Sequence, residues 1–506
     1  MNTGKTLIFY FLLTFLLFIN NGKIVSAQQI KNPFSMISRG DTLYISIKSA
    51  VTDALKRNPT VTIQALEQDK AKSLVSLEIS SFEPQITASA TQSKSELQRL
   101  LGTRVEPLKM SLNNNQYLVG ITEVLPTGTN ISANASMSGQ VSSLYTDQFS
   151  GNVGFTITQS LLQGFGLGAG MANLRKANID LDITNMEMKA IAEQLVADVE
   201  KTYWEYYLAS QEINIQKKSM ELAEKQLQET MERVNVGKLS ELEIAAVNAE
   251  VAQRKEALID AQSNYEQVRL KLIHLLNPGD TDQWSKNIFT TDSPFDPADS
   301  LDTVENHEKI GLKYRPDLIQ AKLSLKKGEV DVVKTRNGLL PKMDFFITFA
   351  RTSYSQSFGH ATPDISSPFY NINGGFNFAL PLTDRNARAA YKYANTSKKQ
   401  LELSLENMQR MVQLDIRSSY IEVLRSREQI DATKITRSLQ EKKLDAELEK
   451  FRVGKSTNFL VLQAQRDFIS SQLDEARSMV SYLNSLINLY QMEGTLLDRR
   501  GINAAY

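Results

Sequence analysis

The chain carries one ordered set of landmarks twice, and this internal repeat constrains its fold more than any other feature. In the first half, the pair Asn58-Pro59 leads to Pro84, 25 residues beyond its own proline. In the second half, Arg315-Pro316 leads to Pro341 over the same distance. Equal spacing between equivalent prolines predicts two copies of one supersecondary unit, joined head to tail.

A second pair of landmarks supports the repeat. The pattern Asp-x4-Tyr-x-Glu occurs around Tyr203 and again around Tyr420. In both copies a Val-Gly-Lys follows, with its glycine 34 residues after the tyrosine, at Gly237 and Gly454. The predicted boundaries are a first repeat at 28–276, a linker or equatorial segment at 277–312, a second repeat at 313–493 and a C-terminal tail at 494–506.

Each repeat contains a very long helical stretch, at about 174–234 and about 386–451. Apolar residues of the first stretch step by three or four positions, which is the stripe of a packed bundle or coiled coil: Met188, Ala192, Leu195, Val199, Tyr203 and Tyr206. About 60 helical residues make a rod of roughly 90 Å. Return helices of about 35 residues are predicted after each Val-Gly-Lys, at 242–276 and 459–493, and a shorter helix precedes each strand region.

Strand-like alternation follows Pro84 and Pro341, and we expect strands within 84–160 and 341–382. Apolar side chains share one face and small or polar ones the other, as in Met343, Phe345, Ile347 and Phe349. The first half holds about 36 additional residues here, which would form a further hairpin with its turn at 126–128. The fold class is therefore mainly α with a β part.

The alternating strands fit an outer-membrane barrel, although a soluble amphipathic sheet shows the same period. Their position between very long helices favours the barrel. Four core strands are too few to close one, and open edges are not tolerated in lipid. The barrel must then be shared between copies, and three copies with four strands each would give twelve strands, or more if the extra hairpin joins the sheet.

The first 27 residues read as a secretory signal peptide, with Lys5, an apolar run and a small-residue cleavage site at 25–27. The whole chain has 57 basic and 57 acidic residues, so removing Lys5 and Lys23 with the signal leaves a net charge of about −2. We therefore expect no nucleic-acid partner. The chain has no cysteine, so we expect neither a disulfide nor a lipid anchor.

The second Val-Gly-Lys lies in FRVGKST, Phe451–Thr457, which resembles the end of a nucleotide-binding P-loop. A P-loop needs another glycine five residues before Gly454, but Glu449 stands there, within a run of good helix formers. The sequence shows no nucleophile–base constellation and no metal-ligand spacing. His274, His307 and His360 are expected to be structural or solvated. We expect no enzyme, no metal site and no cofactor.

The order of these motifs resembles the TolC-like outer membrane efflux proteins. The residues that carry the resemblance are TLYISIKSAVTDALKRNP, the proline-started strands, TQSLLQGFG, the long helix, RVGKST and a second copy of the set. They cover residues from about 41 to about 498. The resemblance implies a homotrimer with a shared barrel in the outer membrane and a helical barrel in the periplasm. It also implies a periplasmic adaptor and an inner-membrane transporter as partners.

By motif match, the resemblance places the adaptor-binding tips at the two helical turns. The residues are Val236, Gly237, Lys238 and Ser240 in the first half, and Arg452, Val453, Gly454, Lys455 and Thr457 in the second. Their types suit a turn between helices, because glycine can end a helix in the left-handed region and Ser or Thr can cap the next one. The alternative is that each is only a good helical turn.

Some members of this family close the periplasmic end with rings of aspartate, but here Leu460 and Gln463 occupy the corresponding positions. An acidic gate would have to come from Glu241 and Glu243, which follow the first turn. Carboxylates converging on an axis repel one another and attract cations. Alternatively, these glutamates only favour the helix dipole.

The function expected from the resemblance is that of an outer-membrane exit duct for drugs, metals or other toxic solutes. The same architecture serves type I protein secretion, which remains an alternative. A periplasmic coiled-coil adaptor is a further alternative, although adaptors have one helical hairpin and this sequence predicts two.

Overall fold

The structure is a computed structural model that describes residues 38–39, 42–100, 106–143, 146–279, 283–294, 301–357 and 361–502. The predicted signal peptide and His360 lie outside these residues. The chain divides into two units. Among its described residues, the smaller one holds most of a three-stranded sheet in the order β1 (Ser38–Arg39), β2 (Thr42–Ile45) and β7 (Asn287–Thr290), in which the rings of Tyr44 and Phe289 are 5.4 Å apart.

The larger unit contains the long helices that the periodicity predicts. They are α5 (Ala172–Asn235) and α9 (Arg385–Arg452), with 64 and 68 residues, and the return helices α6 (Leu242–Leu276) and α10 (Asn458–Glu493). All six residues of the predicted apolar stripe in α5 are buried. None of the helices in the described part of the chain combines the length and hydropathy needed to cross a bilayer.

Shorter helices precede each sheet segment. They are α2 (Ile47–Arg57), α3 (Pro59–Ser80), α7 (Val304–Tyr314) and α8 (Pro316–Asn337). Pro59 and Pro316 each occupy the first turn of a helix, where the missing N–H costs nothing. The periodicity does not predict α2 or α7. The segment predicted as a linker, 277–312, holds the 3-10 helix η1 (Gln283–Ser285), β7 and the start of α7.

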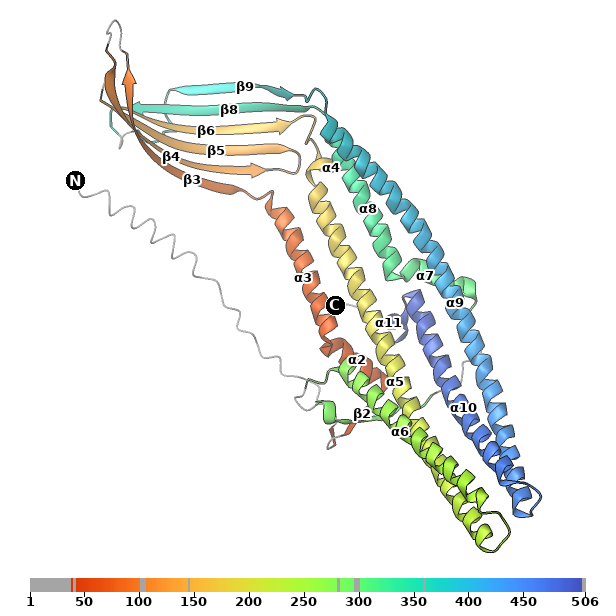
Figure 1. The fold of residues 1–506 in the computed structure, drawn as a ribbon. Coiled ribbons are helices and arrows are strands. Elements are labelled where there is room, and N and C mark those ends of the chain that lie inside the picture. Colours follow the sequence, from red (N-terminus) through yellow and green to blue (C-terminus); the bar gives the residue numbers. More distant parts are fainter. Residues whose placement is uncertain are drawn as a thin grey trace, which may run out of the picture. The chain divides into compact units, whose positions relative to one another are not determined.

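The long helices organise the packing of the larger unit (Figure 1). Helix α5 contacts α3 and α6 from its own half, and α8 and α10 from the other half. Helix α9 contacts α7, α8 and α10. The shorter and return helices thus line up along each long helix, as their summed lengths predict. Between α5 and α9, a column of α8 and α10 joins the two halves.

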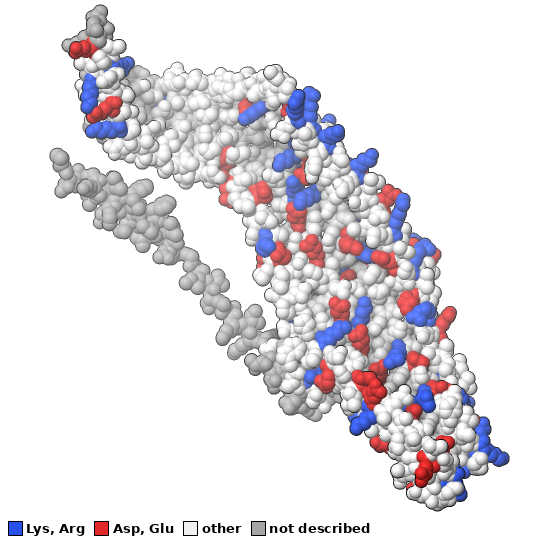
Figure 2. Space-filling model, in the orientation of Figure 1, with Lys and Arg blue, Asp and Glu red and all other residues white. Residues whose placement is uncertain are grey.

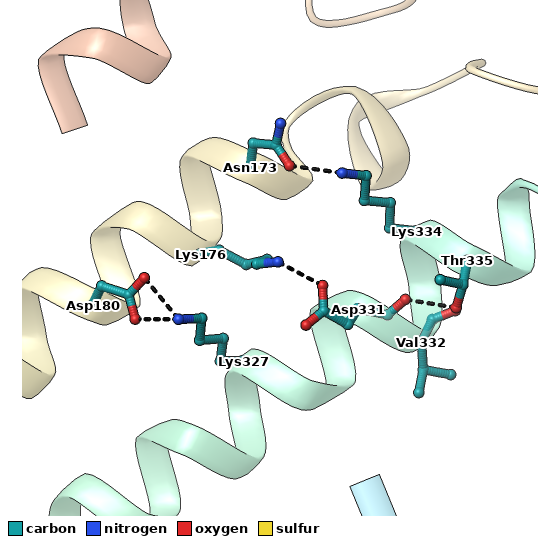
Figure 3. Close-up of polar contacts among 8 residues, drawn as sticks. All are labelled: Asn173, Lys176, Asp180, Lys327, Asp331, Val332, Lys334 and Thr335. Carbon is teal, nitrogen blue, oxygen red and sulfur yellow. Dashed lines mark hydrogen bonds and ion pairs between the residues drawn. The ribbon is translucent and has the colours of Figure 1, made fainter. Parts of the chain in front are cut away.

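Charged pairs hold α5 against α8 near the sheet (Figure 3). Lys176 Nζ lies 2.7 Å from Asp331, and Lys327 Nζ lies 2.6 Å from Asp180. The Lys334 ammonium also donates to Asn173 at 2.9 Å. The sign of the charge alternates between the helices, so these contacts fix the relative register of α5 and α8 more than they add stability, because half-exposed pairs contribute little.

One six-stranded antiparallel sheet follows the short helices. Its strands, in spatial order, are β3 (Gln85–Arg99), β4 (Leu108–Val124), β5 (Thr129–Ser142), β6 (Gln148–Ser160), β8 (Lys342–Ser355) and β9 (Tyr370–Ala379). The additional residues of the first half form β4 and β5, joined by a turn with Gly128 at φ +85°. The sequence leaves open whether the extra hairpin joins the sheet, and the structure shows that it does, so the sheet has two strands more than the core of four.

The two faces of the sheet differ sharply in chemistry. On one face, large apolar side chains stay exposed in this chain: Ile86, Val119, Ile121, Phe155, Phe345, Ile347, Phe349, Ile372, Phe376 and Phe378. On the other face, hydroxyls meet across strands, as in Ser138 with Ser150 at 2.7 Å and Thr156 with Thr348 at 3.0 Å. Figure 2 shows a sheet surface with few charges beside helices that carry many. We name the face with the large apolar side chains the apolar face, and the face with the paired hydroxyls the polar face.

Buried carboxylates gather where the chain ends its last helices. Within the predicted tail, α11 (Leu496–Arg499) buries Leu496 and Leu497 completely. Arg500 then binds the fully buried Glu200 through two contacts of 2.6 and 2.7 Å, and Arg499 binds Glu493, which also contacts the ring of buried His307. These pairs tie the segment after α10 back to α5 and α7.

Glu193 on α5 lacks such a close partner. Its side chain is 4% exposed, and Lys189 Nζ is 3.8 Å away. Burial is the main reason that the pKa of the Glu193 carboxyl rises from 4.5 to about 8. The folded chain therefore binds this proton more tightly than the unfolded chain does. Folding stability should decrease as pH rises from about 4.5 to about 8.

The substitution Glu193→Gln should remove this pH dependence, because glutamine imitates the protonated carboxyl. At pH 8.5 the variant should melt several degrees higher than the unchanged protein, and at pH 5 the two should melt alike. Thermal melts followed by circular dichroism across this range test the expectation, with the exposed Glu256→Gln as control. Parallel pH profiles for all three proteins would contradict it.

Candidate functional site

The two helical turns that the sequence singles out have the same backbone geometry. Gly237 has φ +74° and Gly454 has φ +76°. At the first turn, Lys238 N–H donates to Arg233 O at 2.8 Å and Gly237 N–H to Val234 O at 2.9 Å. At the second turn, the N–H groups of the equivalent residues donate at matching positions, to Lys450 O and Phe451 O. Each turn is a Schellman motif, in which a left-handed glycine ends the helix.

The return helices begin as the sequence predicts in one half and with a shift in the other. Thr457 is the N-cap of α10, and its hydroxyl accepts from Leu460 N–H at 3.4 Å. Helix α6 begins at Leu242, so Glu241 rather than Ser240 holds the N-cap position. The Ser240 hydroxyl still accepts from Leu242 N–H at 3.3 Å. The extra residue lengthens the first turn by one position.

The two turns lie together and border one groove. Residues of both turns line it, and its volume is about 890 Å³. Val236 is 67% exposed and Val453 is 66% exposed. Most of the other lining residues are charged or polar: Glu229, Glu232, Arg233, Lys238, Arg452 and Ser456. An apolar residue thus lies on each turn, inside a rim of mixed charge.

Arg233 joins the two hairpins beneath this groove. Its guanidinium lies 4.3 Å from the centroid of the Phe451 ring, and its Nη1 donates to Phe451 O at 3.0 Å. The Phe451 ring is buried. A cation over an aromatic face is a favourable pair, and burial strengthens it. The end of α5 is therefore fastened to the end of α9.

Two amides and a carboxylate continue this connection at the starts of α10 and α6. Gln226 Nε2 donates to Asn458 Oδ1 at 2.9 Å, and Asn458 Nδ2 donates to Glu243 Oε2 at 3.3 Å. The buried carboxylate of Glu250 then lies 3.3 Å from Arg466 and also binds Arg254. These contacts connect α5 and α6 to α10. We call the Gln226–Asn458–Glu243 set the tip latch.

The structure places the two candidate gate glutamates differently. Glu241 is exposed at the start of α6. Glu243 is half-buried, and its carboxylate accepts the hydrogen bond from Asn458. In this chain, then, Glu243 is held by the neighbouring hairpin. At the other turn, the hydrogen bond from Lys450 to Glu447 is the main reason that the pKa of the Glu447 carboxyl is lowered.

Sequence reasoning misses Arg233, Phe451, Gln226 and Asn458. The contact partners are separated by more than 200 residues, and neither residue of a pair is unusual by itself. One signal is available: Arg233, three residues before Val236, and Phe451, two residues before Val453, both lie in the last turn of a helix that ends at a Val-Gly-Lys. Among the described residues, no three His, Asp or Glu side chains come together as a metal site requires.

Comparison with known proteins decides the family. A family model described as outer membrane efflux protein matches residues 50–278 and 311–495. The chain belongs to this family. The family comprises transport channels of the outer membrane, and we therefore place the chain in the outer membrane.

Relatives share the family at low identity. The outer membrane protein TolC of Salmonella enteritidis is 24% identical over 317 residues, which make up 61% of this chain and 62% of TolC. The pyoverdine export outer membrane protein OpmQ of Pseudomonas putida is 21% identical over 324 residues, 62% of this chain and 64% of OpmQ. The match thus spans less than two thirds of the length of either relative.

A solved structure shows the same fold over most of the chain. The Campylobacter jejuni CmeC outer membrane channel has a TM-score of 0.67 and 16% identity, with 89% of this chain and 86% of CmeC covered. The mainly helical fold with its sheet is therefore that of a TolC-like channel.

The tip turns of this efflux protein depend on left-handed glycines. Gly454→Ala should cost about 1–2 kcal/mol locally, because a Cβ disfavours this conformation. Nothing lies within 4 Å of the added Cβ, so a clash is not the cause. Hydrogen exchange followed by mass spectrometry should show faster exchange across residues 447–460 only. Lys455→Ala, one residue on, is the control, and equal exchange in both variants would contradict the expectation.

Proposed function

We propose that the chain is the outer-membrane exit duct of a tripartite efflux system. Three copies form a barrel in the outer membrane and a helical tube in the periplasm. An inner-membrane transporter supplies the solute, and a periplasmic adaptor connects the transporter to the duct. The duct itself conducts small molecules passively.

The exposed apolar face of the sheet carries this proposal. Phe376 and Phe378 are 61% and 62% exposed, and Ile86 is 76% exposed. Contact between such a surface and lipid tails costs no free energy, whereas its exposure to water is unfavourable. Strands β3 and β9 each pair with one neighbour among the described residues. Unpaired strand edges are not stable in lipid, which supports completion of the sheet by further copies.

The helices support the trimer independently. Exposed apolar residues form a stripe along α9, which is at one edge of the helix array: Leu403, Leu414, Ile421, Ile435 and Leu439. Others lie along α3 at the opposite edge: Ile63, Leu66, Leu74 and Leu77. Contact between the α9 edge of one copy and the α3 edge of the next buries both stripes and continues the array into a tube.

Matched element lengths support the proposed internal repeat. Helices α2 and α7 both have 11 residues, and α3 and α8 both have 22. Three copies would then present six similar tips to an adaptor. The exposed valines of the tip groove offer the apolar contacts, and the charged rim sets orientation, as in other protein interfaces.

The cargo class is proposed from one relative. OpmQ is named for pyoverdine export, and on that basis we propose small molecules rather than secreted proteins as cargo. A secretion duct would instead release a protein substrate into the medium. Deleting the gene therefore distinguishes the two functions: small solutes accumulate in the cell if the chain is an efflux duct, and a protein substrate is retained if it is a secretion duct.

Deleting the gene in its host should raise drug sensitivity several-fold and increase the retention of fluorescent efflux substrates, while protein secretion continues. The full-length chain should restore efflux. Val236→Asp with Val453→Asp should not, because charge at the tips disrupts apolar contact with the adaptor. The isosteric pair Val236→Thr with Val453→Thr should retain most activity. Normal efflux in the aspartate variant, with trimers intact in the outer membrane, would contradict the tip assignment.

We also propose the tip latch as the periplasmic gate. Asn458→Ala removes the hydrogen bonds to both Gln226 and Glu243, so single-channel conductance in planar bilayers should rise several-fold. Glu243→Gln keeps a hydrogen-bonding group but removes the charge. It should lower cation preference if three Glu243 carboxylates converge, and leave conductance nearly unchanged. Equal conductance for Asn458→Ala and the unchanged channel would show that the latch is no gate.

A further inference from the structure

We propose that three copies close an eighteen-stranded barrel, by pairing β9 of each copy with β3 of the next in one defined register, and that this barrel has a wide, uncharged lumen. The inference rests on the proposed outer-membrane duct and deepens it.

Six strands per copy follow from an unbroken ladder. Residue pairs align without interruption from β3 through β4, β5, β6 and β8 to β9. The apolar face stays in phase along the way: Ile86 aligns with Ile121, then Ala133, Phe155, Phe349 and Ile372. The inserted hairpin is therefore continuous with the barrel wall. It does not fold over the sheet as a loop.

The two edge strands suit each other in direction. Strand β3 leaves α3 and runs away from the helices, whereas β9 returns and leads into α9 (Figure 1). Every neighbouring pair in the sheet is antiparallel. A β9–β3 contact between copies continues this alternation. Both strands are almost entirely exposed in the single chain.

The register follows from barrel geometry and from where β3 begins. Ile86 and Ile372 lie on one line of paired residues that crosses all six strands. The stagger is the shift, in residues along the strand, between this line in one copy and the same line in the next. With no stagger, β9 would pair only through residues 370–373, with 85–88, because β3 starts at Gln85. Strands tilted by about 35–45° require a total stagger of about 18 to 24 residues in an eighteen-stranded barrel, or about six to eight per copy. A stagger of six pairs the whole of β9 with 85–94.

This register matches side chains on both faces. On the apolar face it sets Phe378 beside Ile86, and Phe376 beside Ala88, a large residue beside a small one. On the polar face it sets Asn373 beside Thr91. An even stagger is also the only kind that keeps each strand's apolar residues on the lipid side, because the side chains of a strand alternate between faces.

The polar face shows what the lumen would present to a solute. Along the six strands it carries amides and hydroxyls, including Asn134, Asn152, Asn371, Asn373 and Asn377. None of the described polar-face residues that align with β3 between Thr87 and Ser93 is charged. Lys342 and Asp344 lie on it at the helix end, 3.6 Å apart. A wall without net charge discriminates little between anions and cations.

Strand number sets the width. With strands about 4.8 Å apart and tilted, eighteen strands give a backbone diameter of about 34 Å and twelve give about 23 Å. Barrels of 16–18 strands leave an aqueous channel. The exit thus admits bulky solutes of either charge, and selection falls to the tip groove and the gate.

Cysteine pairs test the register, because the chain has no cysteine of its own. Asn373→Cys combined with Thr91→Cys reports a stagger of six, and Asn373→Cys with Ser93→Cys reports a stagger of eight. Oxidation of outer-membrane fractions should give covalent dimers and trimers with one of these pairs, reversed by reductant. Asn373→Cys with Ala90→Cys, which faces the opposite side, and each single variant should stay monomeric in denaturing gels.

Electron cryomicroscopy of the unmodified trimer provides a second measurement that needs no variant. Eighteen strands in the barrel cross-section support the inference, and twelve overturn it. Absence of interchain links in both test pairs, in a trimer that still restores efflux, refutes the edge register and leaves the proposed duct intact. A chain that forms no trimer in the outer membrane refutes the proposed duct itself.

Discussion

In the proposed outer-membrane barrel, the need to satisfy every backbone hydrogen bond in lipid governs how the chain is arranged. Six strands pair with one another, but β3 and β9 keep one open side each among the described residues. In water such edges would be a hazard for aggregation, and in lipid they are untenable for a single chain. In the proposed trimer the constraint would reach the helices as well, because copies that joined at the sheet would also bring the exposed stripes of α9 and α3 together. One requirement would then account for both sets of unburied apolar residues.

Much of this fold could be predicted from the sequence because its elements are long and regular. The stripe through Val199 and Tyr206 is buried as its spacing predicts. The bounds of α6, Leu242–Leu276, agree with the predicted helix, because a glycine turn and a left-handed Asn277 mark its ends. Alternating residues also located the strands. The hairpin of β4 and β5 could be predicted from its turn, but its place within the sheet could not, because strand neighbours depend on pairing between distant segments.

At the candidate site, too, some features could be predicted from the sequence and others could not. Local geometry at Gly237 and Gly454 follows from residue type, since glycine alone adopts a positive φ without strain. The contacts that join the hairpins do not follow from residue type. Arg233 meets Phe451, and Asn458 meets Glu243, only because two long helices end at the same level. Buried Glu193 is a similar case: its carboxyl is isolated by neighbours from other helices, and no local pattern announces that.

Strand number and helix number are linked in the proposed trimer. Each copy offers four helical columns: α3 with α6, then α5, then α8 with α10, then α9. Twelve columns spaced about 8–10 Å apart give a tube about 96–120 Å around. Eighteen tilted strands give about the same circumference, whereas twelve strands would give about 72 Å. The inserted hairpin would therefore match the width of the barrel to that of the tube. Because the proposed path would then keep about the same width through both, we expect its narrowest point at the tips, where the latch lies.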